Sequence, residues 1–212
     1  MKTTLHYLFD PLCGWCYGLA PAVSGLLKYP AVSLELLPIG LFSGGGARPL
    51  DDVFAAYAWS NDQRIQHLTG QPFSMRYRDR ILGDRRQRFD SGPATVALTA
   101  VSLTEPAREL EALKAIQHAR YVDGNDVVSL VALADLLKTL GLDDAAAKVE
   151  HPDAELLAAS RARVNRAQAL MRESGASGAP TLIVESGGRR RVLDHTAAYS
   201  NPPLLISQFE AA

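Results

Sequence analysis

The hydrophobic pattern at the start of the chain predicts a strand, a helix and a second strand. Thr3–Phe9 is a short apolar and aromatic run that stops before Pro11, because a proline makes continuing the strand unfavourable. Over residues 14–28 the apolar positions recur at helical spacing, and the run 33–38 is too short for a helix. In such a unit the two strands are expected to be parallel, with a right-handed crossover.

The remaining pattern predicts a long helical region followed by a hairpin and a closing helix. After the glycine-rich stretch 43–46, we expect helices over 51–66, 93–103, 106–121, 126–140 and 153–173. The runs 181–185 and 189–194, joined through Gly187 and Gly188, predict two paired strands. Asn201 as an N-cap and Pro202 in the first turn then predict a helix over 204–209. The order indicates an α/β fold.

Composition narrows the classes of partner. The 212 residues include 22 basic and 23 acidic side chains, and this balance gives no overall field that would attract nucleic acid or an anionic membrane. The chain begins without a signal-peptide pattern and holds no apolar run long enough to span a bilayer, so we expect a cytoplasmic protein. A start at Met1 that replaces a removed signal peptide stays open as an alternative.

The chain has two cysteines, Cys13 and Cys16, at the beginning of the first predicted helix. This count excludes a framework of structural disulfides and leaves a catalytic pair or a metal site. Structural zinc needs four ligands, and the five histidines are not paired at ligand-like spacing, so we expect no metal. Inert core cysteines are less favoured, because a helix start is where a thiolate is stabilised.

The spacing of the two cysteines suits thiol–disulfide exchange. Cys13 would lie at the helix N-terminus, where unpaired backbone N–H groups and the helix dipole stabilise a thiolate. Cys16 would lie one turn further along the same face, shielded and less acidic. We therefore assign Cys13 as the attacking thiol and Cys16 as the resolving thiol.

Three motifs together resemble the DsbA family of thioredoxin-fold oxidoreductases. They are Phe9-Asp10-Pro11, the Cys-Gly-Trp-Cys-Tyr-Gly stretch at 13–18, and Gly178-Ala179-Pro180-Thr181 ahead of a strand. The first two look most like the cytoplasmic FrnE-type branch, whose members are often labelled protein-disulfide isomerases. The resemblance implies a thioredoxin-like fold with a large all-helical insertion: residues 1–42 and 155–212 would form the thioredoxin-like domain, and 43–154 the insertion.

The resemblance also implies roles for individual residues. Pro180 would be the cis-proline of the family, which with Ala179 places the substrate backbone beside the dithiol. Trp15 would either contact substrate or pack against the insertion. Many thioredoxin-like proteins carry a buried acid where this chain has Tyr7, so the proton of Cys16 needs another acceptor.

Two acidic residues are candidates for that proton transfer. Asp10 would either assist Cys16 or cap the loop before the helix, and we leave these two roles open. Glu35, on the second predicted strand, is a weaker candidate.

The function expected from these residues is thiol–disulfide oxidoreductase or isomerase activity. No cofactor is needed, although glutathione is a candidate co-substrate. The partner would be a disulfide-containing protein or a glutathione-like molecule, and the oligomeric state stays open. One rival is a glutathione-dependent enzyme of the 2-hydroxychromene-2-carboxylate isomerase or kappa-class transferase type, although those relatives usually carry serine at the position of Cys13. Another rival is a non-enzymatic, chaperone-like module that grips extended peptides.

Overall fold

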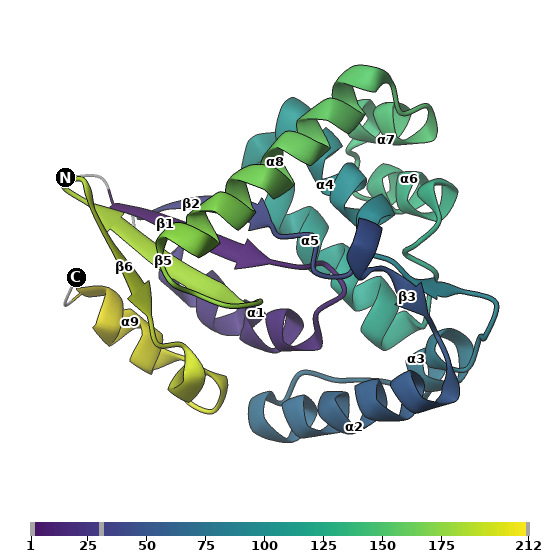
Figure 1. Ribbon diagram of the computed structural model, residues 1–212, viewed down its shortest axis with the longest axis horizontal. Coiled ribbons are helices and arrows are strands. Elements are labelled where there is room, and N and C mark those ends of the chain that lie inside the picture. The colour runs from purple at the N-terminus through teal and green to yellow at the C-terminus, as the bar shows by residue number, and fades with distance from the viewer. Residues whose placement is uncertain (1–2, 30–31, 211–212) are drawn as a thin grey trace.

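The computed structural model, which describes residues 3–29 and 32–210, contains a central four-stranded mixed sheet. The sheet has the order β2-β1-β5-β6 (Figure 1). Its strands are β1 (Thr3–Phe9), β2 (Val32–Pro38), β5 (Thr181–Ser186) and β6 (Arg189–Leu193). β1 and β2 are parallel, whereas β5 pairs antiparallel with both β1 and β6. The predicted strand–helix–strand unit and the C-terminal hairpin are thus confirmed.

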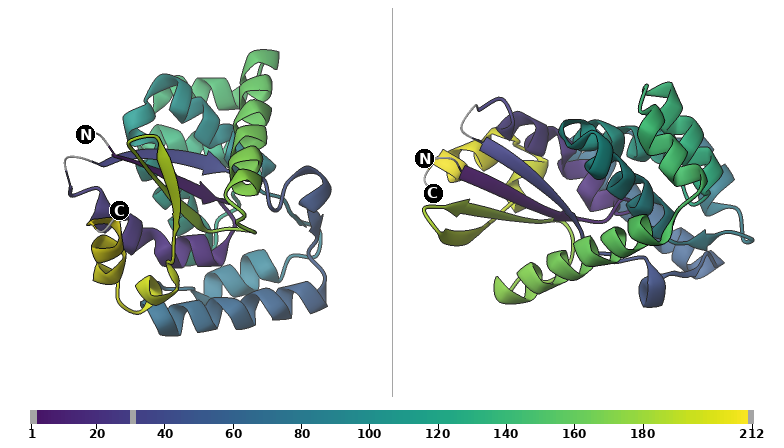
Figure 2. Two further views of the ribbon diagram at one scale, coloured as in Figure 1. Left: turned by 60° about the vertical axis from the view of Figure 1, so that its left-hand side comes forward. Right: turned by 90° about the horizontal axis from the view of Figure 1, so that it is seen from above.

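Helices cover both faces of the sheet, and successive side chains of β1 pack alternately against the helices on one face and on the other. Leu5, Tyr7 and Phe9 are buried in the core that includes α1 (Gly14–Leu26), while Leu8 packs in a second cluster with side chains of α8 (Ala154–Glu173). Figures 1 and 2 agree that α8 crosses one face and that α1 and α9 (Pro203–Glu210) lie on the other. The result is a thioredoxin-like fold carrying a helical insertion.

The segment between β2 and α8 is mostly helical, with loops and two short strands between its helices. Its elements are η1 (Gly44–Gly46), β3 (Arg48–Pro49), α2 (Asp52–Thr69), α3 (Met75–Tyr77), η2 (Arg78–Leu82), β4 (Arg88–Phe89), α4 (Gly92–Thr104), η3 (Pro106–Arg108), α5 (Glu109–His118), η4 (Ala119–Asp123), α6 (Leu130–Thr139) and α7 (Asp143–Glu150). The turn η5 (Thr196–Tyr199) precedes α9. One hydrophobic core runs from α1 into α4–α7, so the division at residues 42/43 and 154/155 stays a prediction.

Several predicted boundaries are wrong. The helix expected over 106–121 is three consecutive elements, because the turn η4 widens to π-helical geometry and ends where Gly124 takes a φ of 66°. The helix expected from residue 126 begins only at Leu130, behind the N-cap Ser129, and α7 was not predicted. No helix within the described ranges is both long and apolar enough to cross a membrane.

Helix α1 carries a proline in its interior, and a side chain of the insertion compensates for it. Pro21 has no N–H, so the carbonyl of Tyr17 lacks its helical partner. The amide of Gln71 donates a hydrogen bond to that carbonyl at 3.2 Å. The helix that carries both cysteines therefore depends on the insertion for one of its backbone hydrogen bonds.

Candidate active site

Both cysteines lie at the beginning of α1 as free thiols, but they differ in exposure. Cys13 is the N-cap residue, with extended backbone angles, and its carbonyl accepts the first helical hydrogen bond from Tyr17. Cys13 is 6% exposed and reaches a surface cavity, whereas Cys16 is fully buried. Of the two thiols, Cys13 is therefore the one that a molecule entering the cavity can reach.

The surroundings of Cys16 favour its neutral thiol. Burial raises the pKa of the Cys16 thiol well above its ordinary value, and the neighbouring Cys13 raises it further. Tyr7, which occupies the position of the acid in other thioredoxin-like proteins, donates a hydrogen bond from its hydroxyl to the Cys16 carbonyl at 3.1 Å. Burial also raises the pKa of Tyr7, so its phenol stays neutral and supplies no carboxylate for the proton of Cys16.

The loop before β5 contacts Cys13 through Ala179. The Ala179–Pro180 peptide bond is cis, as the resemblance implied, and the Cys13 thiol donates to the Ala179 carbonyl at 3.6 Å. Gly178 has a φ of 88°, a conformation that side-chain-bearing residues rarely adopt. Cys13, Ala179 and Pro180 therefore come together although they are far apart in the sequence.

Asp10 fastens the loop before the cysteines to the insertion. Its Oδ1 accepts a hydrogen bond from the Leu12 amide at 2.9 Å, and its Oδ2 accepts from the Phe42 amide at 3.1 Å and the Ser91 hydroxyl at 2.7 Å. Asp10 and Ser91 are fully buried. Burial raises the pKa of Asp10, while these donors pull it downward. The negative charge of Asp10 raises the pKa of the nearby Cys16 thiol, whereas the Asp10 backbone lowers it.

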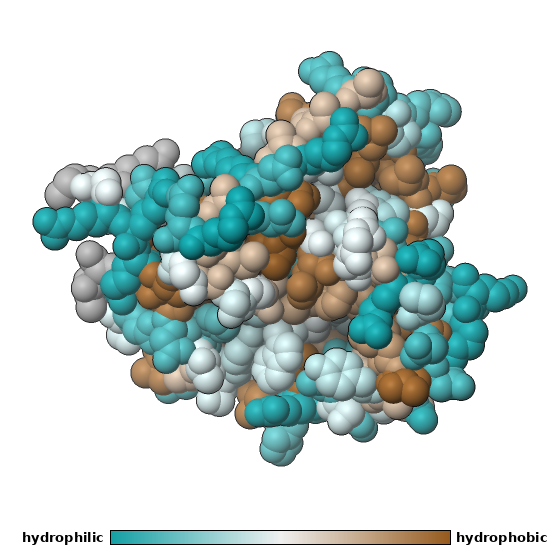
Figure 3. All heavy atoms as spheres, in the orientation of Figure 1, coloured by the Kyte–Doolittle hydropathy of each residue, from teal (hydrophilic) through white to brown (hydrophobic). Residues whose placement is uncertain are grey.

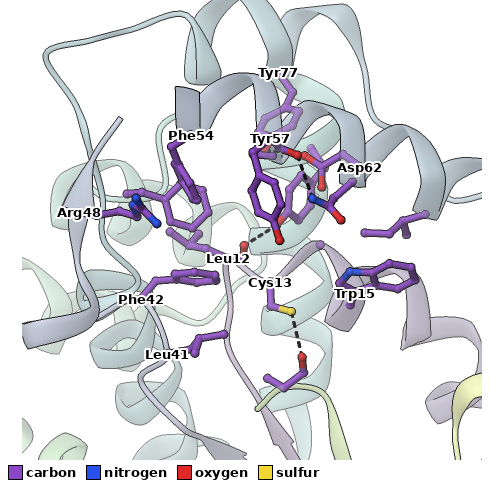
Figure 4. Close-up of a pocket in the computed structure, with 17 residues that line it drawn as sticks. Leu12, Cys13, Trp15, Leu41, Phe42, Arg48, Phe54, Tyr57, Asp62 and Tyr77 are labelled. Atoms are coloured by element: carbon purple, nitrogen blue, oxygen red, sulfur yellow. Dashed lines mark hydrogen bonds between the residues drawn. The ribbon is translucent and has the colours of Figure 1, made fainter. Parts of the chain in front are cut away.

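A cavity of about 300 Å³ opens beside Cys13, between α1 and the insertion (Figure 4). Aromatic rings form much of its wall, and Arg48 lies 4.2 Å from the centre of the Phe54 ring at its rim. Phe42 and Phe54 each meet Phe89 edge to face. In the orientation of Figure 1, the space-filling view shows hydrophobic surface near the middle of the molecule, bordered by polar side chains (Figure 3). The cavity suits an apolar group.

Trp15 lies half-buried between two parts of the chain. Its ring meets the edge of Tyr199 with 5.0 Å between the centroids, and the exposed Arg64 lies 5.7 Å from the Trp15 ring centre. Trp15 also lines the cavity beside Cys13. It therefore packs against the C-terminal segment and α2 while keeping a surface toward the cavity.

The buried carboxyl group of Asp62 is a feature of this cavity that the sequence reasoning missed. Asp62 is 5% exposed and accepts a hydrogen bond from the Tyr77 hydroxyl at 2.9 Å. Burial raises its pKa to about 7, against the opposing effects of Tyr77 and Arg120. A signal did exist, because Asp62 follows Ala55 by seven residues and precedes Ile65 by three, on the buried face of α2.

Glu35 was a wrong choice as a proton-transfer candidate. Neighbouring residues of a strand point to opposite faces, and Glu35 pairs with His6 at 2.7 Å and with Arg166 of α8 at 2.7 Å. It therefore lies on the α8 face of the sheet, whereas the cysteines are on α1. Within the described part of the chain, no three His, Cys, Asp or Glu side chains form a group that could hold a metal ion.

An aromatic cluster joins the insertion to the active-site loop. Tyr121 stacks on Tyr17 of α1 at 4.9 Å between centroids and meets Phe73 and Tyr77 edge to face. Its hydroxyl donates to the Leu12 carbonyl at 2.8 Å, directly before Cys13. The position of the dithiol relative to the insertion is therefore fixed by packing and by a buried hydrogen bond.

Comparison with solved structures finds close relatives along the full chain. The cytosolic disulfide reductase DsbM from Pseudomonas aeruginosa is 34% identical, with a TM-score of 0.87 over 98% of this chain and 97% of that one. Its structure with GSH (glutathione) aligns at 31% identity and a TM-score of 0.82, covering 98% of both chains. A protein from Nitrosomonas europaea, described as a disulfide isomerase, is 25% identical, with a TM-score of 0.79 over 100% of this chain and 98% of that chain. No protein-family model and no curated protein matches.

Proposed function

Because the chain belongs to the DsbA family of thioredoxin-fold oxidoreductases, we propose that it is a cytosolic disulfide reductase that works through Cys13 and Cys16. Thiol–disulfide oxidoreductase activity is common to its close relatives. The observation that carries the proposal is the asymmetry of the pair: Cys13 borders the cavity at a helix N-terminus, and Cys16 is fully buried behind it. The cytosolic location is inferred from the DsbM relative.

The proposed reaction proceeds through a mixed disulfide. The Cys13 thiolate attacks one sulfur of the substrate disulfide, and the other substrate sulfur leaves as a thiolate that takes a proton from water. Cys16 then gives up its proton and attacks the sulfur of Cys13, which releases the second substrate thiol and closes the Cys13–Cys16 disulfide. Two electrons have passed to the substrate. Two molecules of a low-molecular-weight thiol such as glutathione then restore the dithiol and leave joined as their own disulfide.

Ala179 and Pro180 are proposed to position the substrate. The Ala179 carbonyl, which now accepts from the Cys13 thiol, would instead accept from the backbone of an extended substrate segment. Trp15 is proposed to contact the same segment from the other side of Cys13, since it lines the cavity there. This arrangement would place a substrate sulfur in line with Cys13.

Asp10 is proposed to combine the two roles that the sequence left open. Its carboxylate holds the loop through three buried donors, which supports a capping role. Its charge also acts on Cys16, and burial raises its pKa, so it has an increased tendency to hold a proton. It would receive the proton of Cys16 when that thiol attacks.

Glutathione is the proposed co-substrate. The support is the DsbM relative, whose structure was solved with GSH, together with a cavity of about 300 Å³ beside the attacking thiol. That volume is at the lower end of the range for small-molecule sites, which fits a tripeptide that is partly exposed.

The decisive experiment compares Cys13→Ser and Cys16→Ser with the unchanged protein. We expect Cys13→Ser to abolish the reduction of a disulfide-bonded peptide when glutathione is the reductant. Cys16→Ser should accumulate a mixed disulfide on Cys13 that mass spectrometry detects. Turnover that survives in Cys13→Ser would contradict the proposal. Prevention of client aggregation that is equal in all three proteins, without reductase activity in any of them, would favour the chaperone-like alternative.

A further inference from the structure

The carboxyl group of Asp62 reaches the N-terminus of α1 from the insertion, directly beside the attacking cysteine. A Cβ atom placed on Gly14, the residue after Cys13, would lie 2.5 Å from Asp62 Oδ1 and 3.1 Å from Ile65 Cδ1. Gly14 does not need its glycine for a positive φ, because its backbone is helical. Its lack of a side chain is what lets α2 bring a carboxyl group against the helix start.

The two oxygens of Asp62 differ in their partners. Oδ2 accepts the hydrogen bond from Tyr77, whereas no hydrogen bond within the described residues reaches Oδ1, the oxygen nearest Gly14. Asp62 and Cys13 line the same cavity (Figure 4). One oxygen of a buried carboxyl group is therefore free to bind a proton beside the position at which a thiolate forms.

The charged and titratable groups around Asp62 come from several elements. Tyr77 lies next to η2, and Arg120 and Tyr121 belong to η4. Arg120 is 2% exposed, lies 5.4 Å from the Tyr77 ring centre, and favours the ionised form of Asp62. Burial raises the pKa of the Tyr121 phenol most, and the charges of Asp62 and Cys13 raise it further, so both act on one buried group. Asp62 and Cys13 thus share a single low-dielectric environment.

We propose that Asp62 and Cys13 share one negative charge at the N-terminus of α1, so that Asp62 takes up a proton whenever Cys13 becomes a thiolate. Two anions this close to one helix end disfavour each other, and one of them is held neutral. This inference rests on the proposed function only in taking Cys13 as the redox-active thiol. Asp62 then acts on the reaction only through the ionisation of Cys13, as a positioning residue that needs no contact with substrate.

The proposal changes the proton balance of the redox step. When Asp62 is ionised in the disulfide form, reduction consumes two electrons and two protons and yields the Cys13 thiolate, the Cys16 thiol and the neutral Asp62 carboxyl. Without the carboxylate, the same reduction consumes two electrons and one proton. Ionised Asp62 also disfavours the dithiol form relative to the disulfide, because it opposes the thiolate. The insertion thereby makes the pair more reducing, in the direction required of a reductase.

The test is Asp62→Asn, which keeps the shape and removes the charge. Thiolate absorbance of the reduced protein would be followed from about pH 4 to 10, and the potential would be measured against glutathione buffers at several pH values above 7. We expect about tenfold more Cys13 thiolate at pH values where the unchanged protein is mostly thiol. A tenfold change in the equilibrium constant is about 30 mV for two electrons, so the potential should change by about 60 mV per pH unit in the unchanged protein and about 30 mV in the variant.

Two further variants make the result specific. Asp79→Asn removes an exposed carboxylate from the same insertion and should match the unchanged protein. Tyr77→Phe removes the hydrogen bond that favours ionised Asp62, so it should shift Cys13 in the same direction as Asp62→Asn, by a smaller amount. Tyr77→Phe therefore carries the test if Asp62→Asn does not fold.

The proposal is overturned if the thiolate titration and the pH dependence of the potential in the folded variant superimpose on those of the unchanged protein. Neither measurement depends on catalytic turnover. A protein without reductase activity that still shows the Asp62 effect would contradict the proposed function and leave this inference standing.

Discussion

Replacing Asp10 with alanine should remove the attachment of the active-site loop to the insertion. The change leaves three donors without their acceptor: the amides of Leu12 and Phe42 and the hydroxyl of Ser91. An unsatisfied buried donor costs about 1–3 kcal/mol. Removing a carboxyl group whose burial is itself unfavourable recovers part of that cost, so we expect a loss of about 3–6 kcal/mol in the free energy of unfolding.

Two smaller substitutions divide this cost into steps. Ser91→Ala removes one hydrogen bond and should cost about 1 kcal/mol. Asp10→Asn can keep an oxygen for Leu12, but its NH2 group then stands where Phe42 and Ser91 donate and accepts from neither, so it should cost about 1–3 kcal/mol. The loss should therefore increase from Ser91→Ala through Asp10→Asn to Asp10→Ala.

Urea unfolding followed by circular dichroism, with the reduced protein throughout, measures each value. The slope with denaturant should be the same in all variants, because the surface exposed on unfolding is unchanged. An Asp10→Ala protein within about 1 kcal/mol of the unchanged one would refute the role assigned to these hydrogen bonds.

Three further predictions concern the same region. Burial raises the pKa of Asp62 to about 7, so the folded state holds this proton more tightly than the unfolded chain does. Ionising Asp62 between about pH 4 and 7 therefore costs up to about 4 kcal/mol of the free energy of unfolding, and the unchanged protein should lose stability over that range relative to Asp62→Asn. Parallel pH profiles of the two proteins in urea unfolding would contradict this. Gly14→Ala should destabilise the protein by about 1–3 kcal/mol, despite the better helix propensity of alanine, because the new Cβ meets Asp62. The cost should decrease in an Asp62→Ala background, where Ile65 alone stays close. Equal costs in both backgrounds of this double-mutant cycle would exclude the contact between residue 14 and Asp62. Gln71→Ala should cost about 0.5–1.5 kcal/mol, because it leaves the Tyr17 carbonyl without its donor. Gln63→Ala, at an exposed position of α2, should change the thermal midpoint little. Equal effects of the two substitutions would disprove that Gln71 replaces the hydrogen bond that Pro21 cannot donate.

The sequence predicted the sheet and the dithiol helix well because their signals are local. Thr3–Phe9 is apolar, ends before a proline and is followed by a helical period, and each of these features is visible within a few residues. Gly187 and Gly188 likewise mark the hairpin between β5 and β6, where both adopt positive φ. The partners of the dithiol loop were reached through the family resemblance, since nothing local connects Pro180 to Cys13.

The parts that escaped prediction depend on contacts between distant segments. The helical period continues through residue 121, but η4 widens into a π turn that buries Arg120 and Tyr121 against Tyr77. Asp62 has the helical spacing of a core position but a charged side chain typical of the surface. Its burial depends on distant partners, namely Gly14, which leaves room for it, and Tyr77, which donates a hydrogen bond to it. Asp10 appeared in the sequence as a residue with two candidate roles, because its donors at Phe42 and Ser91 come from elsewhere in the chain.

The reduction potential of the Cys13–Cys16 pair at pH 7 tests the central claim most directly. Equilibration with glutathione buffers, followed by acid quenching, thiol alkylation and mass spectrometry, gives the fraction of protein in the dithiol form. A disulfide reductase should have a potential near that of thioredoxin, about −270 mV. A value near −120 mV, as for a strongly oxidising DsbA, would contradict the proposed direction of electron flow.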